Sequence, residues 1–179
     1  MKTLFAPVLL VLMANLGTAS ANELLAAAVV ETEGSWSGEL IYRDFGTDKR
    51  VSIPHRRTIH VGPNGSYALH QNTFTDPGYK VFSAQMVRVT PEAFVIASTT
   101  PDGIETETLL VKTATRESSI FEIVATGSGA DDGKPAELRL RIRSSPTQMS
   151  IERSVRAPGG TRYEFRNEVR LNREPSSVR

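Results

Sequence analysis

The amino-acid sequence predicts an all-β fold, an antiparallel up-and-down meander of about ten strands that closes into a barrel behind a short N-terminal helix. Two observations predict it. After residue 33, β-branched and aromatic runs are broken at close intervals by Gly, Pro, Asn and Asp, and the last run, 161–173, alternates strictly between apolar and charged residues. Short loops make neighbouring strands antiparallel, because a parallel pair needs a long crossover. Closure is favoured because it removes the unpaired sheet edges.

The N-terminus has the three parts of an export signal. Lys2 supplies the positive start, Leu4 to Leu16 an apolar run, and Ala19-Ser20-Ala21 a small-residue cleavage site. The apolar run is shorter than the ~20 residues of a membrane span. We therefore predict a signal peptide over residues 1–21, a periplasmic or secreted location, and one mature domain over residues 22–179 without a transmembrane segment.

Composition excludes several classes of partner and stabiliser. The chain has no Cys, so disulfides cannot hold the fold. Removing Lys2 with the signal brings the formal net charge from +1 to 0. A balanced charge without a basic cluster favours neither nucleic acid nor an anionic membrane surface, and we expect a soluble monomer.

The first element of the mature chain is a short helix. An Ala/Leu/Val segment over Leu24 to Val30 follows Asn22, a possible N-cap, and ends before Gly34. We expect one or two helical turns.

The strands follow from the positions of the turn residues, which leave about ten runs joined by short loops. The breaks fall near residues 45–48, 62–65, 76–78, 90–92, 101–103, 115–117, 127–135, 144–146 and 157–160.

Two hairpins predict a register. A three-residue loop at 158–160 sets Arg153 opposite Phe165 and Ile151 opposite Asn167 on an inner face, with acidic and basic residues opposed outside. Asn167 is then a polar group on an otherwise apolar face, and such a group needs a partner.

The second hairpin turns at Asn64-Gly65, which suits a type I′ turn. We assign its inner face to residues that pair across the two strands, although the opposite face, with Tyr67 and Leu69, is an alternative. The pairs assigned to the interior are Ile59 with His70, Arg57 with Asn72, and His55 with Phe74.

The sequence contains no recognisable catalytic, metal-binding or phosphate-binding motif. His55 and His60 are five apart on one predicted strand, so alternation sends them to opposite faces and a three-histidine metal site fails. Serine nucleophile motifs are missing, and the glycine-rich loop 127–135 lacks the spacing of a phosphate cradle. Glu105 and Glu107 share one strand face, which we interpret as solvated. We predict that the protein is not an enzyme and that it has no catalytic residue, no metal and no cofactor.

One motif carries a resemblance. Gly34-Ser35-Trp36 stands after the short helix at the start of the first strand and resembles the G-x-W motif of lipocalins and their calycin relatives. The resemblance implies that Trp36 plugs one end of the barrel and packs against an Arg from a late strand, for which Arg166 and Arg170 are the candidates. The strand count resembles the ten-stranded fatty-acid-binding or nitrobindin-like barrels. The C-terminal haem-ligating His of nitrobindin-like proteins has no counterpart, because the last His is His70, so haem is disfavoured.

These observations lead to the hypothesis that the barrel binds a small hydrophobic or amphipathic molecule without catalysing a reaction. The alternative is an envelope carrier or assembly factor, an open half-barrel that receives a lipid or a protein. Pairing of the first strand with the last would favour the closed barrel. The predicted wall residues and head-group contacts are Tyr42, Arg57, Asn72, Phe82, Met86, Arg153, Tyr163, Phe165 and Asn167.

Overall fold

The computed structural model describes residues 21–44, 46–76 and 78–175. These residues form one α-helix, one 3-10 turn and ten strands. The elements are α1 (Ala21–Val30), β1 (Gly34–Arg43), β2 (Arg50–Val61), η1 (Pro63–Gly65), β3 (Tyr67–Asp76), β4 (Tyr79–Val89), β5 (Ala93–Thr100), β6 (Gly103–Glu117), β7 (Ile120–Asp131), β8 (Lys134–Ser144), β9 (Gln148–Arg156) and β10 (Glu164–Arg173).

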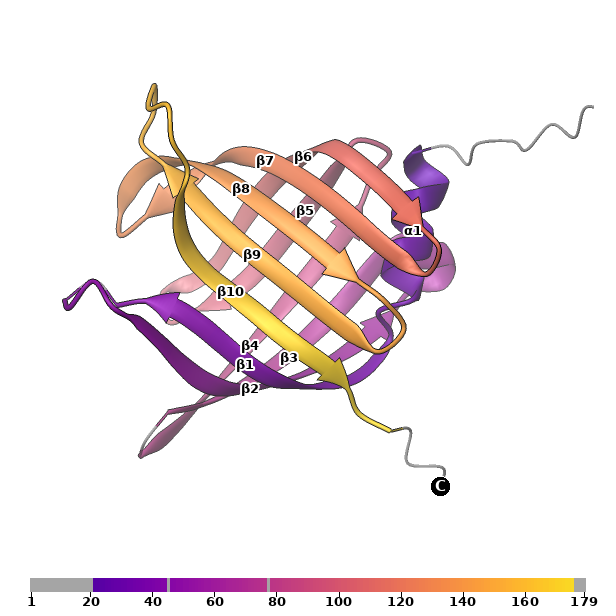
Figure 1. Ribbon diagram of the computed structural model, residues 1–179, viewed down its shortest axis with the longest axis horizontal. Coiled ribbons are helices and arrows are strands. Elements are labelled where there is room, and N and C mark those ends of the chain that lie inside the picture. Colours follow the sequence, from indigo (N-terminus) through magenta and orange to yellow (C-terminus); the bar gives the residue numbers. More distant parts are fainter. Residues whose placement is uncertain (1–20, 45, 77, 176–179) are drawn as a thin grey trace, which may run out of the picture.

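The ten strands close into a barrel in which each strand is antiparallel to its neighbours in sequence (Figure 1). The first strand pairs with the last, from Trp36 opposite Arg173 to Tyr42 opposite Asn167. This contact confirms the closed meander, and it removes the open half-barrel on which the alternative function depended.

Helix α1 covers one end of the barrel (Figure 1). Leu25 and Ala28 are buried in a core cluster with Phe94, Leu109 and other inward side chains of the strands. The helix begins at Ala21, so Asn22 lies inside it and is not its N-cap as predicted. The Ala-rich sequence explains the longer helix, because Ala has the highest helix propensity. No described helix has the length and apolar character needed to cross a membrane.

The hairpin at Asn64-Gly65 has the predicted register and the predicted inner face. His55 pairs with Phe74 and Arg57 with Asn72. Asn64 and Gly65 have φ angles of 57° and 68°, the left-handed conformation that favours these two residue types. A Cβ on Gly65 would also lie 2.4 Å from the backbone oxygen of Ala26, so this turn and α1 need a glycine to pack together.

In the C-terminal hairpin the register differs from the predicted one by two residues. Asn167 pairs with Arg153, and the register shifts between Phe165 and Asn167. The shift has two causes: residues 157–163 form a longer loop than expected, and a β-bulge inserts an extra residue into β10. Because the slip is by an even number, Asn167 still faces inward.

The closed end of the barrel is sealed around Trp36, which is 1% exposed. Its Nε1–H donates to the backbone oxygen of Thr32 at 2.8 Å, and the guanidinium of Arg173 lies 4.2 Å from its ring centroid. Neither of the predicted arginines fills this role. Arg166 lies near the opposite end of β10, and Arg170 is paired with Glu168 at 2.8 Å, whereas Arg173 is the residue in register with Trp36.

Arg173 also ties the helix connection to the barrel, since it donates to the backbone oxygens of Pro146, Glu33 and Glu31. We expect Arg173→Ala to lower the free energy of unfolding by about 2–3 kcal/mol, because it removes a cation–π contact and leaves carbonyls without donors. Chemical denaturation followed by the fluorescence of Trp36 measures this. Arg170→Ala is the matched control and should cost less than about 1 kcal/mol, as expected for an exposed ion pair.

Candidate functional site

The barrel encloses a cavity of about 420 Å³ between the end covered by α1 and the opposite end, here called the open end because no described helix covers it. Its volume lies within the range of small-molecule sites. Apolar side chains from several strands form most of the wall: Val87, Phe94, Leu109, Ile123, Leu140 and Val169. Polar side chains from β2, β3, β6, β9 and β10 reach the same space: Arg57, His70, Asn72, Glu105, Glu107, Arg153 and Asn167.

Arg57 is the central polar residue of the cavity. Alternation along β2 turns it inward with Ile53, His55 and Ile59, and it is only 6% exposed. Its Nε donates to Oδ1 of Asn72 at 2.7 Å, and within the described part of the chain its two terminal nitrogens have no hydrogen-bond partner. Burial lowers the pKa of Arg57 to about 10 and no carboxylate counteracts the shift. The guanidinium is therefore charged at neutral pH and has no counter-ion among the described residues.

Two histidines flank Arg57 in the interior. His55 stacks on Phe74 with ring centroids 4.4 Å apart, and its Nε2 lies 3.2 Å from Oδ1 of Asn72. Burial, followed by the charge of Arg57, lowers the pKa of His55 to about 4 and that of His70 to about 3. Both rings are neutral at pH 7, so Arg57 carries the positive charge of this cluster alone.

Asn72 organises the cluster through its side-chain amide. Its oxygen faces both Arg57 and His55, and its nitrogen donates to the hydroxyl of Ser83 at 3.3 Å. Nδ1 of His70 is buried and has no partner among the described residues. The cluster thus offers unused hydrogen-bonding groups toward the cavity at Arg57 and His70.

Arg153 and Glu107 form a second, self-neutralising polar group. Arg153 donates from both terminal nitrogens to the two carboxylate oxygens of Glu107, one at 2.9 Å. We expected Glu107 on a solvated face, but alternation along β6 turns it inward with Leu109, and both line the cavity. Arg153 is therefore already paired, and Arg57 is not.

The predicted site residues fall into two groups. Arg57, Asn72, Arg153 and Asn167 line the cavity, and the other five do not. Tyr42 lies opposite Asn167, beyond the cavity wall formed by Leu40 toward the open end of the barrel.

The remaining aromatic and Met candidates lie elsewhere. Phe82 and Met86 are on the outer face of β4 and are 72% and 43% exposed. Tyr163 lies in the loop before β10 with the guanidinium groups of Arg139 and Arg156 at 4.4 and 4.5 Å from its ring. Phe165 is covered by the guanidinium of Arg50 at 4.0 Å.

Sequence reasoning misplaced Tyr163 and Phe165 because the longer loop and the bulge break the strict alternation before Asn167. It missed the apolar wall of β5 to β8, because Phe94, Leu109 and Ile123 carry no chemical signal. The strict alternation of β2 did place Arg57 on the inner face.

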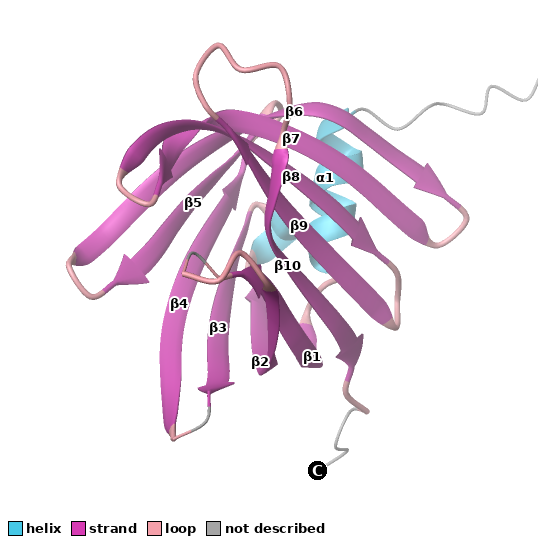
Figure 2. Ribbon diagram, turned by 60° about the vertical axis from the view of Figure 1, so that its left-hand side comes forward, coloured by secondary structure: helices cyan, strands magenta, loops and turns pink. Residues whose placement is uncertain are grey.

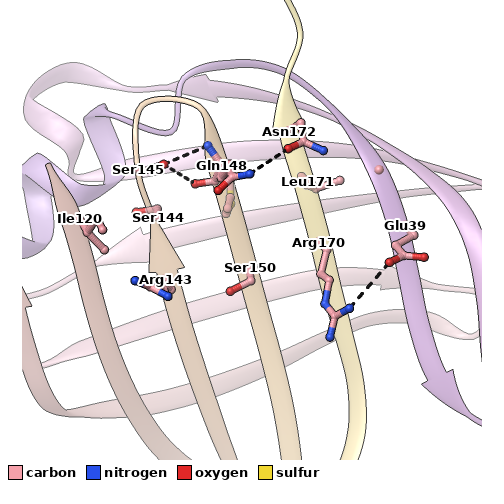
Figure 3. Close-up of a pocket in the computed structure, with 12 residues that line it drawn as sticks. Glu39, Ile120, Arg143, Ser144, Ser145, Gln148, Ser150, Arg170, Leu171 and Asn172 are labelled. Atoms are coloured by element: carbon pink, nitrogen blue, oxygen red, sulfur yellow. Dashed lines mark hydrogen bonds and ion pairs between the residues drawn. The ribbon is translucent and has the colours of Figure 1, made fainter.

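A larger hollow of about 690 Å³ lies on the outer surface across β8, β9, β10 and β1 (Figure 3). Its arginines have acidic neighbours: Arg143 lies 3.2 Å from Glu122, and Arg170 lies 4.0 Å from Glu39 and 2.8 Å from Glu168. Its charges are satisfied locally, so the interior cavity is the stronger candidate for a ligand site.

Comparison with known proteins supports the fold. The sequence matches no family model and no curated protein. Among solved structures, the barrel is similar to the crystal structure of Rv2717c from M. tuberculosis, with a TM-score of 0.61 and 18% identity over 84% of this chain and 98% of that chain. At this identity the likeness concerns the fold alone.

Proposed function

We propose that this protein binds, without transforming it, a small amphipathic molecule whose anionic head group lies against Arg57 inside the barrel. One observation carries the proposal: Arg57, 6% exposed, lines a mainly apolar cavity with a charged guanidinium that has no acidic partner in the described part of the chain. A buried charge without a partner is unfavourable, and an anionic ligand would supply both the counter-charge and the missing acceptors.

The rest of the cavity supports the same class of ligand. Its two cationic side chains differ, because Glu107 already neutralises Arg153 while Arg57 stays free. Glu105 also lines the cavity but forms no ion pair with Arg57 among the described residues. A carboxylate head group can accept from both terminal nitrogens of the Arg57 guanidinium. The apolar wall around Phe94 and Leu109 would then bury the hydrocarbon part of the ligand.

Export is part of the proposal. The signal over residues 1–21 lies almost entirely outside the described residues, and the sequence alone supports it. The mass of the protein recovered from its own cell envelope should correspond to a chain that begins at Asn22. A full-length mass would contradict cleavage.

The test of function compares two ligands with the same chain and different heads. Calorimetry should show dodecanoate binding about tenfold or more tighter than dodecanol, because a charge-assisted hydrogen bond is worth about 1.5–3 kcal/mol. Arg57→Gln should abolish the difference. Arg141→Gln, on the outer face of β8, is the matched control and should leave both affinities unchanged. Equal binding of both ligands to the wild-type protein would refute an anionic head group, and no binding of either would refute the interior site.

A further inference from the structure

The ladder between β4 and β5 is incomplete. It contains five pairs, from Gln85 opposite Ser98 to Val89 opposite Phe94, and it ends there. On its other edge β4 stays paired with β3 as far as Tyr79. Residues 79–84 of β4 therefore have no backbone partner on β5. Figure 2 shows the two strands diverging toward the β3–β4 turn and the β5–β6 turn.

A side chain marks the place where the two strands separate. The hydroxyl of Thr99 accepts from the backbone nitrogen of Ala84 at 3.0 Å and donates to its backbone oxygen at 3.3 Å. The hydroxyl thus replaces the next backbone pair of the ladder. Beyond it β4 and β5 share no backbone pair.

An outer hollow of about 520 Å³ lies over the outer faces of β2, β3 and β4 and extends to Thr99 of β5, with Phe82 and Ala84 in its lining. Asn72 and Ser83 line both this hollow and the interior cavity. These two residues are hydrogen-bonded to each other, and Asn72 also holds Arg57. Ser83 of β4 and Ser98 of β5, which flank the end of the ladder, both line the interior cavity, so the unpaired stretch borders the space that contains the polar cluster.

The open end of the barrel, by contrast, is tied on its other side. Arg166 on β10 donates from Nε to Asp131 on β7 at 2.8 Å, although β8 and β9 lie between these strands in the barrel. A terminal nitrogen of Arg166 donates to the backbone oxygen of Arg43 on β1, also at 2.8 Å. This side chain bridges the rim that joins β7, β10 and β1.

We propose that the ligand enters and leaves through the gap between β4 and β5, with Phe82 and Thr99 at its outer border and Asn72 and Ser83 at its inner border. This inference rests on the proposed function. The outer hollow is the first contact of the ligand, and the cluster around Arg57 is its destination.

The charges on β2 fit this route. Arg56 and Arg57 are adjacent, so alternation places Arg56 in the outer hollow and Arg57 in the cavity. The side chain of Arg56 is 78% exposed, and its acidic neighbour Glu174 is 3.8 Å away. An exposed cation in the outer hollow attracts an anion on approach, whereas the buried one retains it.

The experiment attaches a bulky label at one of two positions, either at the gap or at the open end. Since the chain has no Cys, Thr99→Cys and Asp132→Cys each carry a single thiol, the first at the gap and the second in the β7–β8 turn at the open end. Each variant is compared with and without a polyethylene glycol maleimide attached. Dansylundecanoate, an anionic fluorescent amphiphile, is the probe, and energy transfer from Trp36 reports its arrival in stopped-flow measurements.

We expect the label at residue 99 to slow association and dissociation of the probe together by about tenfold, with little change in affinity, because a blocked route changes both rates equally. Thr99→Trp should act in the same direction without any label. The label at residue 132 should change the rates by less than about twofold.

The opposite pattern, slow exchange with the label at residue 132 and normal exchange with the label at residue 99, would show that the open end is the route and would overturn the gap. Unchanged rates in both labelled proteins would also overturn it. A lack of energy transfer in the unlabelled variants and the wild-type protein would instead refute the proposed interior site itself.

Discussion

Replacing Arg57 by Met should stabilise the ligand-free protein and abolish binding of anionic amphiphiles. Arg57 is 6% exposed, and its guanidinium carries a charge at neutral pH and has one hydrogen-bonded nitrogen. Met has a similar length and removes the desolvation cost of that charge. By analogy with buried ionic groups replaced by apolar ones, we expect the free energy of unfolding to rise by about 1–3 kcal/mol.

The measurement is chemical denaturation of the apo protein beside titration with dodecanoate. Asn72 loses one donor in this variant, but its Oδ1 still faces Nε2 of His55 at 3.2 Å, so the variant leaves no orphaned acceptor. Arg153→Met is the informative comparison, because it leaves the carboxylate of Glu107 without its partner and should lower the stability. If Arg57→Met were destabilising, Arg57 would be a structural residue and its lack of a partner would not indicate a ligand.

The sequence predicted the position of Arg57 but not its lack of an acidic partner. Alternation along β2 and the Asn64-Gly65 turn were enough to place Arg57, Asn72 and His70 on one inner face, because register in a hairpin depends on local turn chemistry. The same alternation left open whether Arg57 had a partner. That depends on which residues of distant strands face it, and these positions follow from the closure of the whole barrel.

The C-terminal hairpin shows where local reasoning fails. The loop after β9 contains Pro158 and two glycines and has several possible lengths, and the bulge before Asn167 has no marker in the sequence. Tyr163 therefore lies between two arginines outside the barrel instead of in its wall. In the same way, Arg173 and not Arg170 covers Trp36, since the choice between residues three apart depends on register alone.

Acid should destabilise the protein from pH 6.5 downward, well above the range in which carboxylates titrate. The pKa of His55 is lowered to about 4 and that of His70 to about 3, by burial first and by the charge of Arg57 second. In the unfolded chain both return to about 6.5. Above pH 6.5 the rings are neutral in both states and the full stability is present.

As the pH falls below 6.5, the unfolded chain takes up protons that the folded protein does not accept. Each His then lowers the free energy of unfolding by about 1.4 kcal/mol per pH unit until its folded pKa is reached. Both act together between pH 6.5 and about 4, so the loss should steepen below pH 6.5 and approach about 3 kcal/mol per pH unit near pH 5. Glu137, whose pKa is lowered by its hydrogen bond to Arg156, contributes only below its unfolded value near 4.5.

Urea denaturation at several pH values between 7 and 4.5 measures this slope. His70→Gln should halve it, whereas His60→Gln, on the outer face of the same hairpin, should leave it unchanged. A wild-type slope in the His70 variant would contradict the burial of a neutral ring. The Arg57→Met protein provides the last check: without the neighbouring charge, the pKa values of both histidines should rise toward 6.5, and the acid slope should end at a higher pH than in the wild type.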